Sequence, residues 1–173
     1  LVTGAYGFLG RHIAKKLSSE GWQVIGIGHG SWEKDQWCQY GISQFYSSDV
    51  TYENLEKIHS HPFDLVIHCA GSGSVGASYE NPPEDFRKNV VSTYDLLEFI
   101  RLHSPSSHLI IPSSAAVYGF TDKKEINEEY ILNPVSPYGL HKKIIEEIGS
   151  YYSSRYDIQV SIMRFFSIYG AGL

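Results

Sequence analysis

Short apolar runs alternate along the chain with longer stretches in which apolar residues recur every three or four positions. The runs predict strands at 22–28 (WQVIGIG), 43–50 (SQFYSSDV), 64–71 (DLVIHCAG), 108–114 (HLIIPSS) and 158–166 (IQVSIMRFF). Residues 1–3 have the pattern of a strand end. The runs at 64–71 and 108–114 are apolar on both faces, which is typical of strands buried in a parallel sheet.

The stretches between the runs predict four helices. Gly21 ends the first of them, and a capping residue with two prolines begins the third. Their inward positions are Leu9, Ile13 and Leu17 in 8–20; Leu55 and Ile58 in 51–60; Phe86, Val90, Leu97 and Ile100 in 81–103; and Ile144, Ile145 and Ile148 in 137–156. Residues 115–136 are predicted to be a loop.

Strands that alternate with helices indicate an α/β domain with a doubly wound, mostly parallel sheet and right-handed crossovers. Ligands in such sheets bind at the carboxyl ends of the strands. The loops that follow the strands are therefore where we expect the site.

Composition narrows the class of protein. The chain has 173 residues, 42% of them hydrophobic, a mean hydropathy of -0.21 and a formal net charge of -5. These values predict one globular domain, 1–173, that binds no nucleic acid and no membrane. Cys38 and Cys69 are too few for a disulfide framework, which favours a reducing, cytoplasmic location. His59 and His61 lack a metal-binding motif, so we expect no metal.

The stretch TGAYGFLG at 3–10 follows a strand and opens a helix. Its first glycine permits a tight turn, its second lets a pyrophosphate approach the backbone, and its third lets the helix pack on the strand. The helix N-terminus would bind the phosphates. The alternative is a plain glycine-rich turn. Arg11-His12 stands where a nucleotide triphosphatase has Lys-Ser/Thr, which disfavours ATP hydrolysis.

A dinucleotide site usually has an acid at the end of the second strand, and here that position is Gly28. His29, Ser31 and Lys34 lie just beyond and would admit a 2′-phosphate. Glu33 or Asp35 would instead hold the ribose by folding back, or the loop does neither. The sequence leaves NAD and NADP as alternatives.

Tyr138 and Lys142 lie four residues apart on one face of the last predicted helix. A lysine ammonium stabilises phenolate and lowers the pKa of a tyrosine, which then exchanges protons with an alcohol. Such a spacing also arises by chance in a chain with 13 tyrosines. Ser113 and Ser114, at the end of the 108–114 strand, strengthen the interpretation, although a serine pair there is also typical of a turn.

These motifs resemble the extended short-chain dehydrogenases/reductases, in the NAD-dependent epimerase/dehydratase group that acts on nucleotide sugars. The resemblance rests on TGAYGFLG at 3–10, SDV at 48–50, HCAGSGSVGAS at 68–78, KNV at 88–90, SSAAVYG at 113–119, SPYGLHK at 136–142 and RFFSIYG at 164–170. It covers essentially the whole chain in order, and it implies an NAD cofactor, with NADP as the alternative.

The resemblance also implies roles. Ser114 is the catalytic serine, with Ser113 the second choice. Tyr138 is the acid/base, and Lys142 holds the nicotinamide ribose and lowers the pKa of the tyrosine. The chemistry is hydride transfer at a sugar carbon, usually C4. The implied cofactor-binding residues are Gly4, Tyr6, Gly7, Phe8, Leu9, Gly10, His29, Asp49, Val50, Cys69, Ala70, Gly71, Asn89, Tyr138 and Lys142.

Departures from the family pattern restrict the activity. Related dehydratases carry Thr-Asp-Glu where this chain has Ser114-Ala115-Ala116, so the acid pair for eliminating water is missing. Ser167 stands where the family usually has an asparagine, which leaves the sugar open. Gly73 replaces a lysine of some 4-epimerases, which loosens the match to that subgroup. An epimerase or a ketoreductase is expected, and a non-catalytic dinucleotide-binding module of the same fold is the alternative.

The family continues beyond such a chain into a smaller substrate domain. We therefore expect a fragment, inactive by itself, with an apolar surface where that domain packs. The resemblance also implies a homodimer formed by the helices that hold Asn89 and Tyr138. Tyr94, Phe99, Tyr151 and Tyr152 are the candidate outer residues for that contact.

Overall fold

Six parallel strands form one sheet in the order β3-β2-β1-β4-β5-β6 in the computed structural model, which describes all residues 1–173. The strands are β1 (Val2–Thr3), β2 (Val24–Gly28), β3 (Ile42–Ser47), β4 (Leu65–His68), β5 (His108–Ser114) and β6 (Gln159–Phe165). The chain runs outward from β1 to β3, returns to β4 and continues to β6. This is the predicted doubly wound α/β fold.

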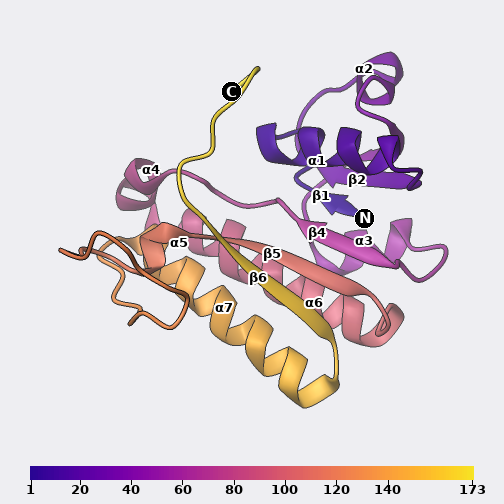
Figure 1. Cartoon of the computed structure of the whole chain (residues 1–173). Coiled ribbons are helices and arrows are strands. Elements are labelled where there is room, and N and C mark those ends of the chain that lie inside the picture. Colours follow the sequence, from indigo (N-terminus) through magenta and orange to yellow (C-terminus); the bar gives the residue numbers. More distant parts are fainter.

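The helices cover the sheet unevenly (Figure 1). They are α1 (Phe8–Ser19), α2 (Lys34–Cys38), α3 (Tyr52–Ile58), α4 (Val75–Glu80), α5 (Pro82–Phe86), α6 (Ser92–His103) and α7 (Pro137–Tyr156). Helix α1 packs on β1, β2 and β3, while α3, α6 and α7 pack side by side on the other face. In Figure 1 no helix lies in front of β5 and β6.

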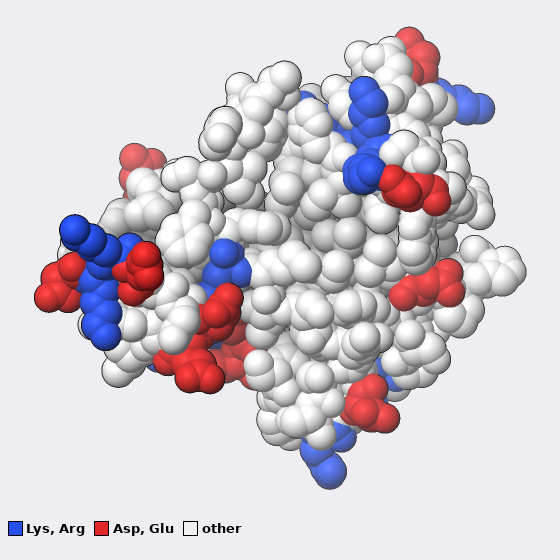
Figure 2. Space-filling model, viewed as in Figure 1, with Lys and Arg blue, Asp and Glu red and all other residues white.

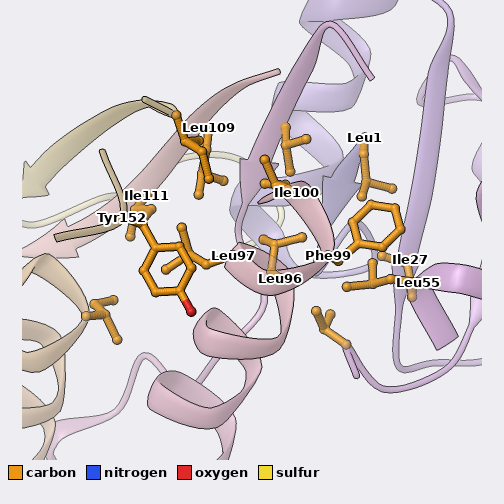
Figure 3. Close-up of a cluster of buried hydrophobic side chains, with 14 of the residues drawn as sticks. Leu1, Ile27, Leu55, Leu96, Leu97, Phe99, Ile100, Leu109, Ile111 and Tyr152 are labelled. Atoms are coloured by element: carbon orange, nitrogen blue, oxygen red, sulfur yellow. The ribbon is translucent and has the colours of Figure 1, made fainter. Parts of the chain in front are cut away.

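The main core lies between the sheet and the layer formed by α3, α6 and α7 (Figure 3). Leu96, Leu97 and Phe99 of α6 are fully buried there, together with Leu109 and Ile111 of β5. A smaller core forms under α1, where Ile13 and Leu17 pack as predicted. Leu9 does not join it and faces the site instead.

The long helix predicted over 81–103 is divided into three parts. Helix α5 passes into a π-helical segment, η1 (Arg87–Val91), and then into α6. The inserted turn changes which positions face inward, because a π-helical turn takes an extra residue. Val90, Leu97 and Ile100 are buried as predicted, but Phe86 is 41% exposed, so its inward assignment is wrong.

Uncharged surface occupies the middle of the face shown in Figure 2, while most Lys, Arg, Asp and Glu side chains lie toward its periphery. Phe166, Ile168, Tyr169 and Leu173, which follow β6, are all exposed. The expected apolar surface is therefore present. The structure contains no helix that is both long enough and apolar enough to cross a membrane.

Two of the four candidate outer aromatics are not on the surface. Tyr94 and Tyr151 are exposed, but Phe99 and Tyr152 belong to the main core. Tyr152 also donates a hydrogen bond from its hydroxyl to Glu98. The prediction that Phe99 and Tyr152 face a partner is wrong, because the face of each helix that they occupy is the one that packs on the sheet layer.

Candidate active site

A groove follows the carboxyl ends of the strands, as parallel-sheet topology predicts. It consists of two adjoining hollows of about 330 and 450 Å³ that share Cys69, Ala70, Gly71 and Ser72. The first hollow includes Gly4, Tyr6, Gly7, His29, Asp49 and Val50. The second includes Phe8, Leu9, Ser114, Tyr138 and Lys142. Of the predicted site residues, only Gly10 and Asn89 line neither hollow.

The glycine turn is built for a close approach between backbones. Gly4 has a φ of +63°, and a Cβ there would lie 2.5 Å from the carbonyl group of Cys69. A Cβ on Gly10 would overlap the carbonyl oxygen of Gly4, so Gly10 serves helix packing rather than ligand contact. Gly7 begins α1 without a side-chain cap, and no acidic residue lies in the first turn. The first N–H groups of α1 are thus free to bind a diphosphate.

Asp49 and His29 are in contact in the first hollow. His29 Nε2 lies 2.5 Å from Asp49 Oδ1, and Arg87 Nη1 lies 3.9 Å from Asp49 Oδ2. Neither Glu33 nor Asp35 lines the hollow. Glu33 instead caps α2 in a capping box, so the interpretation that it folds back onto a ribose is wrong.

Helix α7 brings Tyr138 and Lys142 to the second hollow. Ser136 caps the helix by accepting the N–H of Gly139 at 3.0 Å. Ser78 Oγ of α4 accepts the N–H of Tyr138 at 3.1 Å, which fixes the first turn against a second element. The spacing of four residues then places the Lys142 ammonium over the Tyr138 ring, with Nζ 5.7 Å from its centroid.

Strand β5 contributes the remaining groups and separates the two serines. Ser114 lines the second hollow together with Tyr138, and it lowers the pKa of the phenol. Ser113 turns to the other face of the strand and donates to Glu146 at 2.5 Å. The Lys142 ammonium donates to the Pro112 carbonyl at 3.2 Å. Both serines line the second hollow, but the Ser113 hydroxyl is bonded to Glu146, which leaves Ser114 as the candidate to contact a substrate.

Burial is the largest cause of the shifted pKa values of Tyr138, Lys142 and Cys69. Burial raises the pKa of Tyr138 above its usual value of 10.0, and Ser114 partly offsets that effect. Burial also lowers the pKa of Lys142 to about 8. Apart from burial, only Ser114 and Asp85 shift the Tyr138 pKa, so the expected lowering of this pKa by Lys142 is not found. Cys69 is unreactive, since burial raises the pKa of its thiol to about 12.

Asn89 lies behind the groove. A Cβ on Gly71 would lie 2.6 Å from Asn89 Oδ1, and this buried oxygen has no hydrogen-bond partner within the chain. Its amide group donates to the Asp85 carbonyl at 3.1 Å. The residue supports the floor of the groove from η1.

Sequence reasoning missed several residues of the site. Arg87 and Asp95 line the first hollow. Ser78 holds Tyr138, and a buried Asp85 lies on the neighbouring helix. A signal existed for Ser78, which lies within the quoted 68–78 motif. None existed for Arg87 and Asp95, because the π-helical turn that directs them cannot be read from periodicity.

The chain matches a known family over almost its entire length. Residues 1–172 match the model of the NAD dependent epimerase/dehydratase family. This chain belongs to that family. UDP-glucose 4-epimerase from Pisum sativum is 32% identical over 184 residues, a match that covers 99% of this chain and 52% of the relative.

Solved structures of epimerase/dehydratase family members have the same fold. UDP-glucose 4-epimerase from Thermotoga maritima with UDP-glucose superimposes with a TM-score of 0.87 at 29% identity, covering 98% of this chain and 55% of the other. The enzyme from Brucella ovis in complex with NAD gives a TM-score of 0.82 at 32% identity, covering 96% and 51%. This epimerase/dehydratase chain spans about half the length of the relatives it matches.

Proposed function

We propose that the protein is a nucleotide-sugar 4-epimerase that uses NAD, and that this chain forms the dinucleotide-binding domain with the catalytic residues Ser114, Tyr138 and Lys142. The observation that carries the proposal is their meeting in one hollow at the end of the glycine-turn groove. The similarity to UDP-glucose 4-epimerases, one of them solved with NAD, supports the same chemistry and makes UDP-hexoses the first substrates to test.

The groove fits NAD on three counts. The N-terminus of α1 offers unpaired N–H groups to the diphosphate, and Gly4 and Gly7 leave room for it. Asp49 and Val50 line the adenosine end, and Asp49 supplies the carboxylate that the end of β2 lacks. Cys69, Ala70 and Gly71 join the two hollows, so one extended ligand reaches both.

Residues of this chain transfer the proton of the sugar hydroxyl. NAD held in the groove would supply reversible hydride acceptance at the sugar carbon. Tyr138 takes the proton of the sugar hydroxyl as the C–H bond breaks, and gives it back when the carbonyl is reduced. Ser114 donates a hydrogen bond to the same sugar oxygen, and Lys142 would hold the nicotinamide ribose.

Elimination of water is disfavoured by the turn that follows β5. The short 3₁₀ turn η2 (Ala115–Val117) stands next to Ser114, and its alanines carry no acid or base. The sugar keeps its 6-hydroxyl in the proposed reaction, in contrast to a dehydratase.

A comparison of wild type and Tyr138→Phe in the full-length protein tests the proposal. NAD-loaded protein is given a panel of UDP-hexoses, and epimer formation and reduced-nicotinamide fluorescence are followed. We expect one sugar to be epimerised, with a loss of roughly 10²- to 10⁴-fold in Tyr138→Phe. Tyr151→Phe, which changes an exposed tyrosine on the same helix, is the matched control.

Other outcomes separate the alternatives. Turnover only of 4-keto sugars with reduced cofactor would indicate a ketoreductase. NAD binding without any turnover in either direction would indicate a binding module and would contradict the proposal.

A further inference from the structure

A carboxylate and an imidazole are buried together behind the second hollow. Asp85 of α5 is 3% exposed and His141 of α7 is 7% exposed, and Asp85 Oδ2 lies 2.6 Å from His141 Nδ1. The ring of Phe86 meets the His141 ring edge to face and covers it from outside. Asp85 Oδ1 is also buried and has no partner within the chain.

The pair adjoins the catalytic turn of α7. His141 directly precedes Lys142 and lies three residues after Tyr138, so one helical turn carries all three side chains. The backbone carbonyl of Asp85 accepts the amide of Asn89, which supports Gly71 in the groove. Asp85 thus contacts α7 through its side chain and the groove floor through its backbone.

The buried charge of Asp85 reaches both catalytic groups. It raises the pKa of Lys142 against the larger, opposing effect of burial, and it adds to the raised pKa of Tyr138. The other titratable groups around the ammonium are His68 and Cys69 at the end of β4, and Glu146 on α7. Among the groups that raise the pKa of Lys142, Asp85 has the largest effect.

We propose that Asp85 and His141 are positioning residues for the proposed epimerase: the pair ties the catalytic turn of α7 to α5 and places a buried carboxylate beside that turn as the counter-charge to Lys142. His141 Nδ1 and Asp85 Oδ2 lie within hydrogen-bond distance, so the imidazole holds the carboxylate in place. A buried carboxylate is stable only with such a partner. The inference rests on the proposed function for its catalytic meaning, but its electrostatic part does not.

The first test titrates Lys142 directly and needs no activity. Lysine side chains of the full-length protein are labelled and their chemical shifts followed by NMR against pH, with Lys142→Arg used to assign the signal. In Asp85→Asn the amide oxygen still accepts from His141, but the charge is gone. We expect the Lys142 midpoint to fall by roughly one pH unit. Glu147→Gln removes a charge from the exposed side of α7 and should leave it in place.

The second test separates positioning from mere structural support. Asp85→Asn should shift the pH dependence of epimerisation to lower pH, because loss of the charge also lowers the pKa of Tyr138. His141→Asn keeps a donor near the carboxylate and should retain most activity, whereas His141→Phe should not.

An unchanged Lys142 midpoint in Asp85→Asn overturns the inference whatever the activity. A shifted midpoint in a protein that epimerises no sugar overturns the proposed function, and leaves the counter-charge role established.

Discussion

At the scale of single residues, Gly10 decides how closely α1 approaches the sheet. In Gly10→Ala the methyl group overlaps the Gly4 carbonyl, which is backbone and cannot turn away. We expect the free energy of unfolding to fall by about 1–3 kcal/mol, and NAD affinity to fall with it, because α1 moves off the glycine turn. Urea unfolding and NAD titration measure both. Gly76→Ala, whose Cβ would make only an ordinary contact with Ser74 Oγ at 3.9 Å, should lose neither.

His68 links three elements through a neutral imidazole. Its Nδ1 faces Thr3 Oγ1 at 2.7 Å, and its Nε2 faces Thr93 Oγ1 at 3.1 Å. Thr93 donates its own hydroxyl to the Asn89 carbonyl, so its oxygen accepts from the Nε2–H of His68. Burial lowers the pKa of His68 from 6.5 to about 3. The folded protein therefore holds His68 uncharged where the unfolded chain is protonated.

We expect His68 to make stability depend on pH between 6.5 and 3. The unfolded state binds the extra proton in this range, so the free energy of unfolding falls as pH falls, by up to about 1.4 kcal/mol per pH unit. Urea unfolding at several pH values measures the slope. His68→Gln should be less stable at pH 7 but flatter toward acid. Equal slopes in the two proteins would show that other groups dominate.

At the scale of elements, the cap of α7 sets the direction of the catalytic helix. Ser136 accepts the N–H of Gly139, within one turn of Tyr138. Ser136→Ala should lower the free energy of unfolding by about 1 kcal/mol, since one N–H loses its partner. Ser154→Ala, at the exposed end of α7, should change it by less than about 0.5 kcal/mol. Thermal unfolding compares the two; an equal effect would argue against the cap.

Most elements could be predicted from periodicity, because their apolar positions are also their buried ones. The segments 108–114 and 137–156 match β5 and α7 at both ends. Helices α2 and α4 escaped prediction, since five and six residues are too few to show a helical period. The π-helical turn escaped for another reason, since no residue type indicates where its extra residue is inserted.

The site was predictable where a motif determines it and not where tertiary packing does. The glycine turn and the Tyr138–Lys142 face follow from local spacing. The choice of Ser114 over Ser113 follows from strand alternation once Tyr138 is placed. The Asp85–His141 contact joins residues 56 apart, and only the assembled fold brings them together.

At the scale of the whole molecule, the surface that follows β6 should bind apolar ligands. Phe166 is 65% exposed and Tyr169 is 87% exposed, next to the apolar lining of the second hollow. We expect this chain to enhance the fluorescence of a hydrophobic dye in its folded state. Phe166→Ser with Tyr169→Ser should remove most of that signal, whereas Leu102→Ser on α6 should not. An unchanged signal would place the dye elsewhere.

The sheet order also has a consequence in time. Strand β1 is synthesised before every other strand, yet it lies between β2 and β4, and Thr3 meets His68 across 65 residues of sequence. The glycine turn lacks the Cys69 backbone that packs against Gly4 until β4 and the residues after it have left the ribosome. The groove lacks Tyr138 until α7 follows. Such distant pairings slow folding. A ribosome that pauses before residue 137 would therefore hold a dinucleotide cradle that has no catalytic helix.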